Sequence, residues 1–170
     1  MRNYDKLHRR WKHKRWPFQK RRWSKLQKEL YLVRASGINF QIHCCNYSLS
    51  GATHRTQVTA PRYWISLDKE IIWDWPHDFK KGPHYRRRIF AYPYSDEISD
   101  ISNLMREYID TPKDQLMSRQ FENDYWGLIN ILRAADRRIG QRRLKALKSK
   151  TGNKAARKII EQRMKKNETD

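Results

Sequence analysis

The sequence predicts an α+β fold, a small antiparallel β-sheet packed by helices, and three observations favour it. The chain has 170 residues, which is enough for one domain of ordinary size. Its middle part contains runs with the two-residue alternation of strands, followed by runs with the three- and four-residue spacing of helices. Seven Trp and nine Tyr supply large buried areas to a core that is poor in aliphatic residues. We therefore expect one globular α+β centre.

The predicted strands open this centre. Residues 38–44 alternate apolar and polar, as a half-buried strand does, and residues 46–56 then have the composition of a loop. Residues 62–67 and 71–75 are rich in β-branched and aromatic side chains and flank a short polar break, which is typical of a hairpin. A fourth strand is predicted over residues 89–92. Together they form a small antiparallel sheet.

Helices are predicted on both sides of the strands. Trp23, Leu26, Leu30 and Val33 recur at the spacing of a buried helix face. Four more helices are expected in chain order: one capped near Ser95 or Asp96, one restarting at Thr111 with Pro112 in its first turn, a long one from Phe121 through Ile139 and on to Lys145, and one from Lys154 to Lys166. The two basic ends of the chain are therefore helical extensions of the centre.

Charge divides the chain into three parts. The net charge is +20, yet residues 35–132 contain 11 Lys/Arg and 12 Asp/Glu and are almost neutral. Residues 1–34 contain 13 Lys/Arg against 2 acids, and residues 133–170 contain 14 against 4. We expect a basic Trp/Arg-rich helical arm over 1–34, a globular core over 35–132, and a basic helical extension over 133–170.

Composition also excludes several classes of protein. No run approaches eighteen apolar residues, so a transmembrane helix is excluded, and no apolar stretch of a secretory signal follows the basic N-terminus. The two cysteines, Cys44 and Cys45, are adjacent and suit neither an ordinary disulfide nor a zinc knuckle, so Cys44 is expected to be a small buried hydrophobe. We expect a cytoplasmic protein without a membrane partner, a cofactor or a metal.

Basic side chains interleaved with Trp predict nucleic-acid binding, because cations neutralise phosphates and indole rings stack on unpaired bases. RNA or a single strand is favoured over duplex DNA, since no helix-turn-helix, zinc finger or basic zipper is recognisable. Two clusters are notable: three arginines placed between two predicted strands, and arginines on neighbouring turns of the long helix. The candidate contacts are Arg9, Arg10, Trp11, Lys12, Lys14, Arg15, Trp16, Lys20, Arg21, Arg22, Arg86, Arg87, Arg88, Arg133, Arg137, Arg138, Arg142, Arg143 and Lys145.

The sequence is also compatible with two other classes of protein. A small nuclease would draw on histidines and acids of the centre, such as His43, His77, Asp74 and Asp78, but their spacing matches no metal-binding motif. We therefore predict no catalytic residue and no enzyme. The alternative is an interaction protein whose basic ends dock on acidic protein or lipid surfaces.

The order of elements also carries a resemblance. A Trp/Arg-loaded first helix, strands such as residues 40–43 and 63–67, and a capped helix follow one another in a recognisable order, and the separate stretch at residues 125–140 also looks like phage or mobile-element accessory proteins. This order, over about residues 5–110, resembles small basic accessory proteins of phages and mobile elements, among them anti-CRISPR proteins that inhibit Cas9. The resemblance implies a partner of the kind of a host ribonucleoprotein, such as Cas9 with its guide RNA, and carries over no functional residue.

Overall fold

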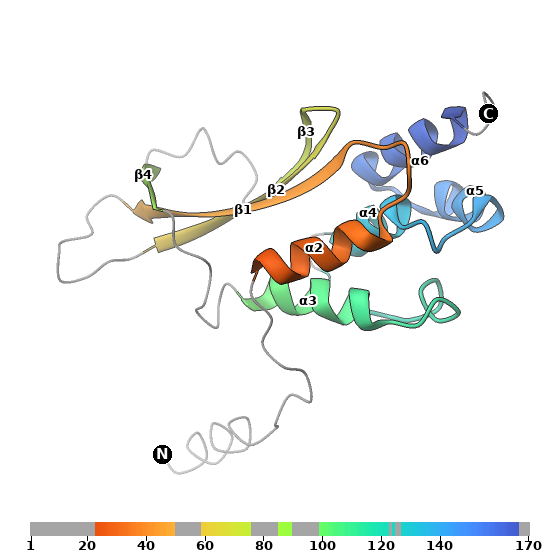
Figure 1. Ribbon diagram of the computed structural model, residues 1–170, viewed down its shortest axis with the longest axis horizontal. Coiled ribbons are helices and arrows are strands. Elements are labelled where there is room, and N and C mark those ends of the chain that lie inside the picture. The colour runs from red at the N-terminus through yellow and green to blue at the C-terminus, as the bar shows by residue number, and fades with distance from the viewer. Residues whose placement is uncertain are drawn as a thin grey trace, which may run out of the picture.

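Four strands and five helices make up the part of the chain that the computed structural model describes, which is residues 23–49, 59–75, 85–89, 99–122, 124 and 127–166 (Figure 1). In chain order these are α2 (Trp23–Val33), β1 (Phe40–Leu49), β2 (Thr59–Leu67), β3 (Glu70–Trp75), β4 (Tyr85–Ile89), α3 (Ser99–Asp110), α4 (Leu128–Ala135), α5 (Gln141–Lys150) and α6 (Lys154–Lys166). The predicted α+β class is confirmed. None of the described helices is long and apolar enough to cross a membrane.

The strands form one antiparallel sheet in the order β3-β2-β1-β4. β1 pairs with β2 along nearly its whole length, from Phe40 opposite Leu67 to Ser48 opposite Thr59. β2 and β3 are joined by a tight turn at Asp68 and Lys69, whose φ angles of 50° and 71° lie in the left-handed region. Two successive positive φ angles match the right-handed twist of a hairpin, which confirms the predicted hairpin.

Helix α2 packs against one face of the sheet. It also lies along the edge of β1, in the part of that strand that precedes its pairing with β4. Trp23 packs edge-on against Tyr63, with ring centroids 5.4 Å apart. At the open edge of β1, before its pairing with β4 begins, Gln27 Nε2 donates to the carbonyl oxygen of Ile42 at 2.6 Å, and the amide of Ile42 donates to the Tyr31 hydroxyl at 3.2 Å. These side chains occupy strand groups that would otherwise offer a free edge for pairing.

Helices α4, α5 and α6 complete the core rather than standing apart from it. Leu144 of α5 and Ile159 of α6 are fully buried in one continuous cluster that also contains Ile65 of β2 and Leu132 of α4. Helix α6 also reaches the residues beside the β2–β3 turn, where Lys158 forms an ion pair with Glu70. The described part of the predicted basic C-terminal extension is thus helical, and its apolar face belongs to the same core as the sheet.

The predicted long helix from Phe121 through Ile139 to Lys145 is wrong at both ends, since Phe121 is not helical and α4 begins only at Leu128. α4 ends at Ala135, and Asp136 has extended backbone angles (φ −82°, ψ 123°). The backbone there bonds to the end of α2 instead of continuing the helix: the Ala35 amide donates to the Ala135 carbonyl oxygen, and the Arg137 amide donates to that of Val33, both at 2.8 Å. A new helix, α5, begins only at Gln141.

Three further local expectations need correction. Residues 113–118 form successive turns rather than the helix expected after Thr111. β1 continues to Leu49, where a loop was expected, because both β2 and β4 pair with its second half. Residues 86–88 lie within β4 rather than between two strands. The cap expected at residues 95 and 96 lies outside the described residues.

Candidate nucleic-acid interface

The basic surface of α5 and α6 follows from their sequences. Between residues 137 and 166 the chain has thirteen Lys/Arg and a single acid, Glu161. The few apolar residues hold each helix against the core: Leu144 and Leu147 of α5, and Ile159 and Ile160 of α6, are buried. Because the apolar face of each helix is buried against the core, the basic side chains lie on the outward faces.

Most of these cations are exposed. The exposed set comprises Arg137, Arg142, Arg143, Lys145, Lys150, Lys154, Arg157, Lys158, Lys165 and Lys166. Carboxylates neutralise few of them: Lys158 pairs with Glu70, and the half-exposed Lys148 pairs with Glu161 at 3.1 Å. Arg142, Lys145 and Lys154 meet no carboxylate within the described ranges. Their charges are therefore available to an external anion.

The predicted contact residues separate into three groups. Arg137, Arg142, Arg143 and Lys145 are exposed, with Arg137 in the turn before α5 and the others on α5, so they do not share one long helix as expected. Arg133 and Arg138 are used inside the molecule. The rest are not placed as side chains: the arginines of residues 86–88 lie on β4, and Arg9, Arg10, Trp11, Lys12, Lys14, Arg15, Trp16, Lys20, Arg21 and Arg22 lie outside the described residues.

Arg138 belongs to a buried network around Asp136. Its Nε and Nη2 atoms donate to the Asp136 carboxylate at 2.9 and 2.7 Å, and Nη1 donates to the Thr111 carbonyl oxygen at 3.1 Å. The Tyr108 hydroxyl donates to the same carboxylate at 2.8 Å. Burial alone lowers the pKa of Arg138, but its hydrogen bonds to Asp136 and the negative charge there outweigh burial and raise it. Arg138 is thus a structural cation that stays charged.

Arg163 is a second internal cation, and no feature of the sequence distinguishes it from the many other basic residues. Its Nη1 atom donates to the carbonyl oxygens of Ala134 and Asp136, and Nη2 donates to that of Ile139. A cation at the end of α4 satisfies carbonyl groups that have no partner within the helix. Burial lowers the pKa of Arg163. This arginine joins α6 to the turn after α4.

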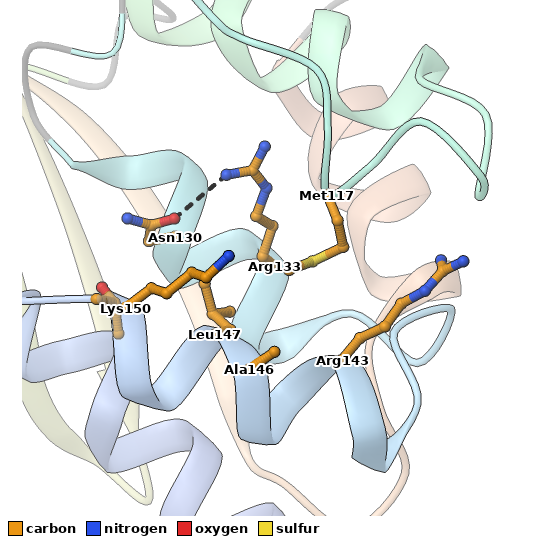
Figure 2. A pocket seen from close by; sticks show the side chains of 8 residues that line it. Met117, Asn130, Arg133, Arg143, Ala146, Leu147 and Lys150 are labelled. Carbon is orange, nitrogen blue, oxygen red and sulfur yellow. Dashed lines mark hydrogen bonds between the residues drawn. The ribbon is translucent and has the colours of Figure 1, made fainter.

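A groove opens between α5, α4 and the turns at residues 113–118, with a cavity of about 360 Å³ (Figure 2). One wall is a stripe of α5 with spacing i, i+3, i+4 and i+7. The facing wall comes from α4 and the turns. The lining residues are Met117, Asn130, Arg133, Arg143, Ala146, Leu147, Lys150 and Thr151. No acid lines this groove, which combines three cations with an apolar middle.

Arg133 belongs to the facing wall of the groove and is held there by hydrogen bonds. Its guanidinium donates to the carbonyl oxygens of Leu116 at 2.7 Å and Arg119 at 2.9 Å, and to Asn130 Oδ1 at 3.3 Å. All three acceptors are neutral, so hydrogen bonds fix the side chain without cancelling its charge. Burial lowers the pKa of Arg133. The sequence predicted this residue as a contact but did not predict Met117, Asn130 or Lys150, which come from other segments.

A second cavity of about 590 Å³ adjoins the first and shares Met117, Asn130 and Arg133 with it. Two acids, Glu122 and Asp124, line this second cavity. Asp124 is already engaged, because its carboxylate accepts from the amides of the first residues of α4. The acids make this cavity less suited to an anion than the groove beside α5.

The histidine and acid of the sheet do not assemble into a catalytic pair. His43 stacks on Trp64 with ring centroids 4.9 Å apart, and Trp64 stands between His43 and Asp74 in the strand register. Asp74 is bound by Arg62 through two hydrogen bonds of 2.9 and 2.6 Å. Burial lowers the pKa of His43. Across the described residues, no three His, Cys, Asp or Glu side chains gather to hold a metal.

Cys44 is expected to be chemically inert. Burial raises the pKa of its thiol from 9.0 to about 12, and the reactive species is the thiolate. At pH 8 we therefore expect iodoacetamide to alkylate Cys44 about a thousandfold more slowly than an ordinary thiol, with the rate rising tenfold per pH unit. Peptide mass spectrometry measures this, with the urea-unfolded chain as the fully reactive control. Labelling of native Cys44 as fast as in urea would contradict the prediction.

Comparison with known proteins yields one match. A model of the SF0329 protein family matches residues 22–164, which is more than four fifths of the chain. No curated protein and no solved structure matches. The matched region includes every described helix and strand except the last two residues of α6.

Proposed function

Because the chain belongs to the SF0329 protein family, whose description names no activity, its function must be inferred from its own surface, and we propose that it binds nucleic acid without catalysing a reaction. RNA or another single strand is the favoured ligand. The observation that carries this proposal is the cationic surface of α5 and α6, where ten exposed Lys/Arg lie on two adjacent short helices and their preceding turn. A surface of this kind follows a phosphate backbone by neutralising successive charges.

The geometry of the surface supports a strand rather than a compact anion. Arg142 and Lys145 stand one turn apart on α5, and Lys154 begins α6 after a turn of three residues. Asn153 caps α6, because its Oδ1 accepts from the Ala156 amide at 3.0 Å, so α6 starts directly after this short turn. Cations held along two fixed helices present an extended track, which suits a polymer.

The first test is the salt dependence of binding. With some five to eight phosphates neutralised, the slope of log affinity against log salt is expected to be about −4 to −7, since each phosphate contributes about −0.7 to −0.9. Fluorescence anisotropy with a labelled ten-nucleotide strand, titrated at several salt concentrations, measures it. A duplex of the same length is the comparison ligand. A slope near zero would overturn the phosphate-binding model.

Matched double variants locate the binding surface. Arg142→Gln/Lys145→Gln removes two exposed cations spaced i, i+3 on α5, and Lys25→Gln/Lys28→Gln removes two exposed cations with the same spacing on α2. Both variants lose the same net charge. We expect the α5 variant to make the salt slope shallower by about 1.5 and to weaken binding at low salt, while the α2 variant changes little. Equal losses in the two would show an effect of net charge alone.

The expected inhibition of a host ribonucleoprotein such as Cas9 with its guide RNA stays a prediction within this proposal. A pulldown from the native host, with and without nuclease treatment, addresses it. Partners lost after nuclease treatment support direct nucleic-acid binding. Partners retained favour the alternative class, in which the basic surface docks on an acidic protein.

A further inference from the structure

The groove beside α5 differs from the rest of the basic surface because it is concave and partly apolar. Its volume of about 360 Å³ falls within the range of small-ligand pockets. In Figure 2, Lys150 and Arg143 are attached at opposite ends of the α5 wall, with Ala146 and Leu147 between them; the Lys150 side chain extends toward Leu147, and Arg133 faces this wall from α4. The groove therefore places cations at both ends of an apolar centre.

From this arrangement we infer that the groove is a subsite for one unstacked nucleotide of the bound strand, its base against Met117 and Leu147 and its flanking phosphates at Arg143 and Lys150. The inference rests on the proposed function and specifies where a base, rather than a phosphate, is held. A nucleotide within a strand matches the groove because it has an anionic phosphate on each side of a flat, largely apolar base. The groove has the complementary order of a cation, an apolar centre and a second cation.

The two cations on the α5 wall occupy separate positions and have donors for two phosphates. Arg143 and Lys150 are seven residues apart on α5, which separates them by about 10 Å along the helix axis. Arg143 is steadied by a hydrogen bond of 3.1 Å from Nη1 to the Lys113 carbonyl oxygen, which leaves its remaining donors for a phosphate. Lys150 forms no hydrogen bond or ion pair with another described residue. Both ends of the groove thus offer donors to an incoming anion.

The centre of the groove suits a ring. Met117 supplies a polarisable sulfur, which contacts aromatic rings favourably, and Leu147 is buried beneath it as an apolar floor. Asn130 supplies an amide that can hydrogen-bond to the edge of a base, while Arg133 adds a fixed positive charge whose hydrogen-bond acceptors are all neutral. Asp124 lies near enough to act on the Arg133 charge but forms no hydrogen bond with it, so the guanidinium can still attract an anionic ligand in the groove.

Charge complementarity also favours this cavity over its neighbour. The groove has three cations and no acid in its lining, whereas the adjoining cavity includes Glu122 and Asp124. A phosphate placed in the second cavity would approach two carboxylates, and like charges repel. The strand is therefore expected to pass along α5 and to insert its base between α5 and Met117.

The test fills the groove without changing any charge. Ala146 is exposed and lines the groove, so Ala146→Phe occupies the space meant for the base; Gln141→Phe adds the same ring at an exposed α5 position outside it. Each protein is titrated with a ten-nucleotide thymidine strand and with an abasic strand of equal phosphate count. We expect the wild-type chain to prefer the thymidine strand about tenfold, since stacking a single base is worth about that factor.

The variants then separate the subsite from strand binding in general. Ala146→Phe should bind the thymidine strand about tenfold more weakly and the abasic strand unchanged, while Gln141→Phe matches the wild type with both. Melting temperatures check that each variant is folded. Equal wild-type affinity for the two strands, or unchanged thymidine binding by Ala146→Phe, would overturn the subsite and leave the proposed function standing. Failure to bind either strand would instead overturn the proposed function itself.

Discussion

Replacing Asp136 by Asn is expected to lower the free energy of unfolding by about 3–5 kcal/mol, the usual loss when one partner of a buried ion pair is removed. The carboxylate is 2% exposed and accepts hydrogen bonds from Tyr108, from the Arg138 guanidinium and from the Arg138 amide. Asn has the same shape but carries two amide hydrogens. In either orientation of the Asn side chain, its NH₂ group faces donor groups of Tyr108 or Arg138. The positive charge of Arg138 is also left without its counter-charge.

A surface pair provides the control for this prediction. Glu107 pairs with Arg119 at 2.7 Å, but about a third of each side chain is exposed. Glu107→Gln should therefore cost about 0–1 kcal/mol. Urea denaturation followed by Trp fluorescence gives both values from midpoints at an unchanged slope. If Asp136→Asn costs no more than Glu107→Gln, the network does not stabilise the fold.

A chain that ends at Gly140 is expected to lose cooperative unfolding altogether. The deletion removes four buried aliphatic side chains, Leu144, Leu147, Ile159 and Ile160, and uncovers the α4 residues that pack against them. At about 1.5–3 kcal/mol for each buried side chain, the loss is about 6–12 kcal/mol. Small domains are stable by about 5–15 kcal/mol in total, so little or nothing would remain.

A deletion at the other end serves as the comparison. Residues 1–16 have no apolar face in their sequence, so a chain that starts at residue 17 should unfold with the midpoint of the full chain. Near-ultraviolet circular dichroism and urea titration report both results. A chain ending at Gly140 that still unfolds in one sharp transition would show that residues 35–132 form an independent domain.

The sequence pattern predicted an element correctly where that element buries a single apolar face. The helix predicted from Lys154 to Lys166 has those bounds in the structure, because its apolar residues form one face that packs on the core. The face of Trp23, Leu26 and Leu30 was predicted for the same reason. The hairpin after Leu67 followed from a short polar break between two apolar runs, and the left-handed angles of its turn agree.

The expectations that failed depended on contacts between distant parts of the chain. Nothing in the residues around Asp136 ends a helix by itself; α4 stops because the backbone there pairs with the end of α2, about a hundred residues earlier. In the same way, Thr111 and Pro112 fit a helix start. The following turns instead present carbonyl oxygens to Arg133 and Arg143.

The candidate site was only partly predictable for a related reason. Exposed and internal arginines look alike in a basic sequence, and Arg138 is internal only because Asp136 and the Thr111 carbonyl oxygen meet it. The groove combines Met117, two residues of α4 and one stripe of α5. The stripe from Arg143 to Lys150 had a helical spacing that could have been noticed, whereas its facing wall is a product of the tertiary fold.

The packing of α4 against α6 also sets the order of events during synthesis. The hairpins connect neighbouring segments and can form as soon as they leave the ribosome, whereas α4 waits for a helix made later. About 130 residues separate the ends of α2 and α6, which at about 5–20 residues per second is an interval of about 7–26 s. For the last part of that interval the apolar face of α4 is open to the chaperones of the nascent chain, so translation speed between Leu128 and Lys166 governs how long this exposure lasts.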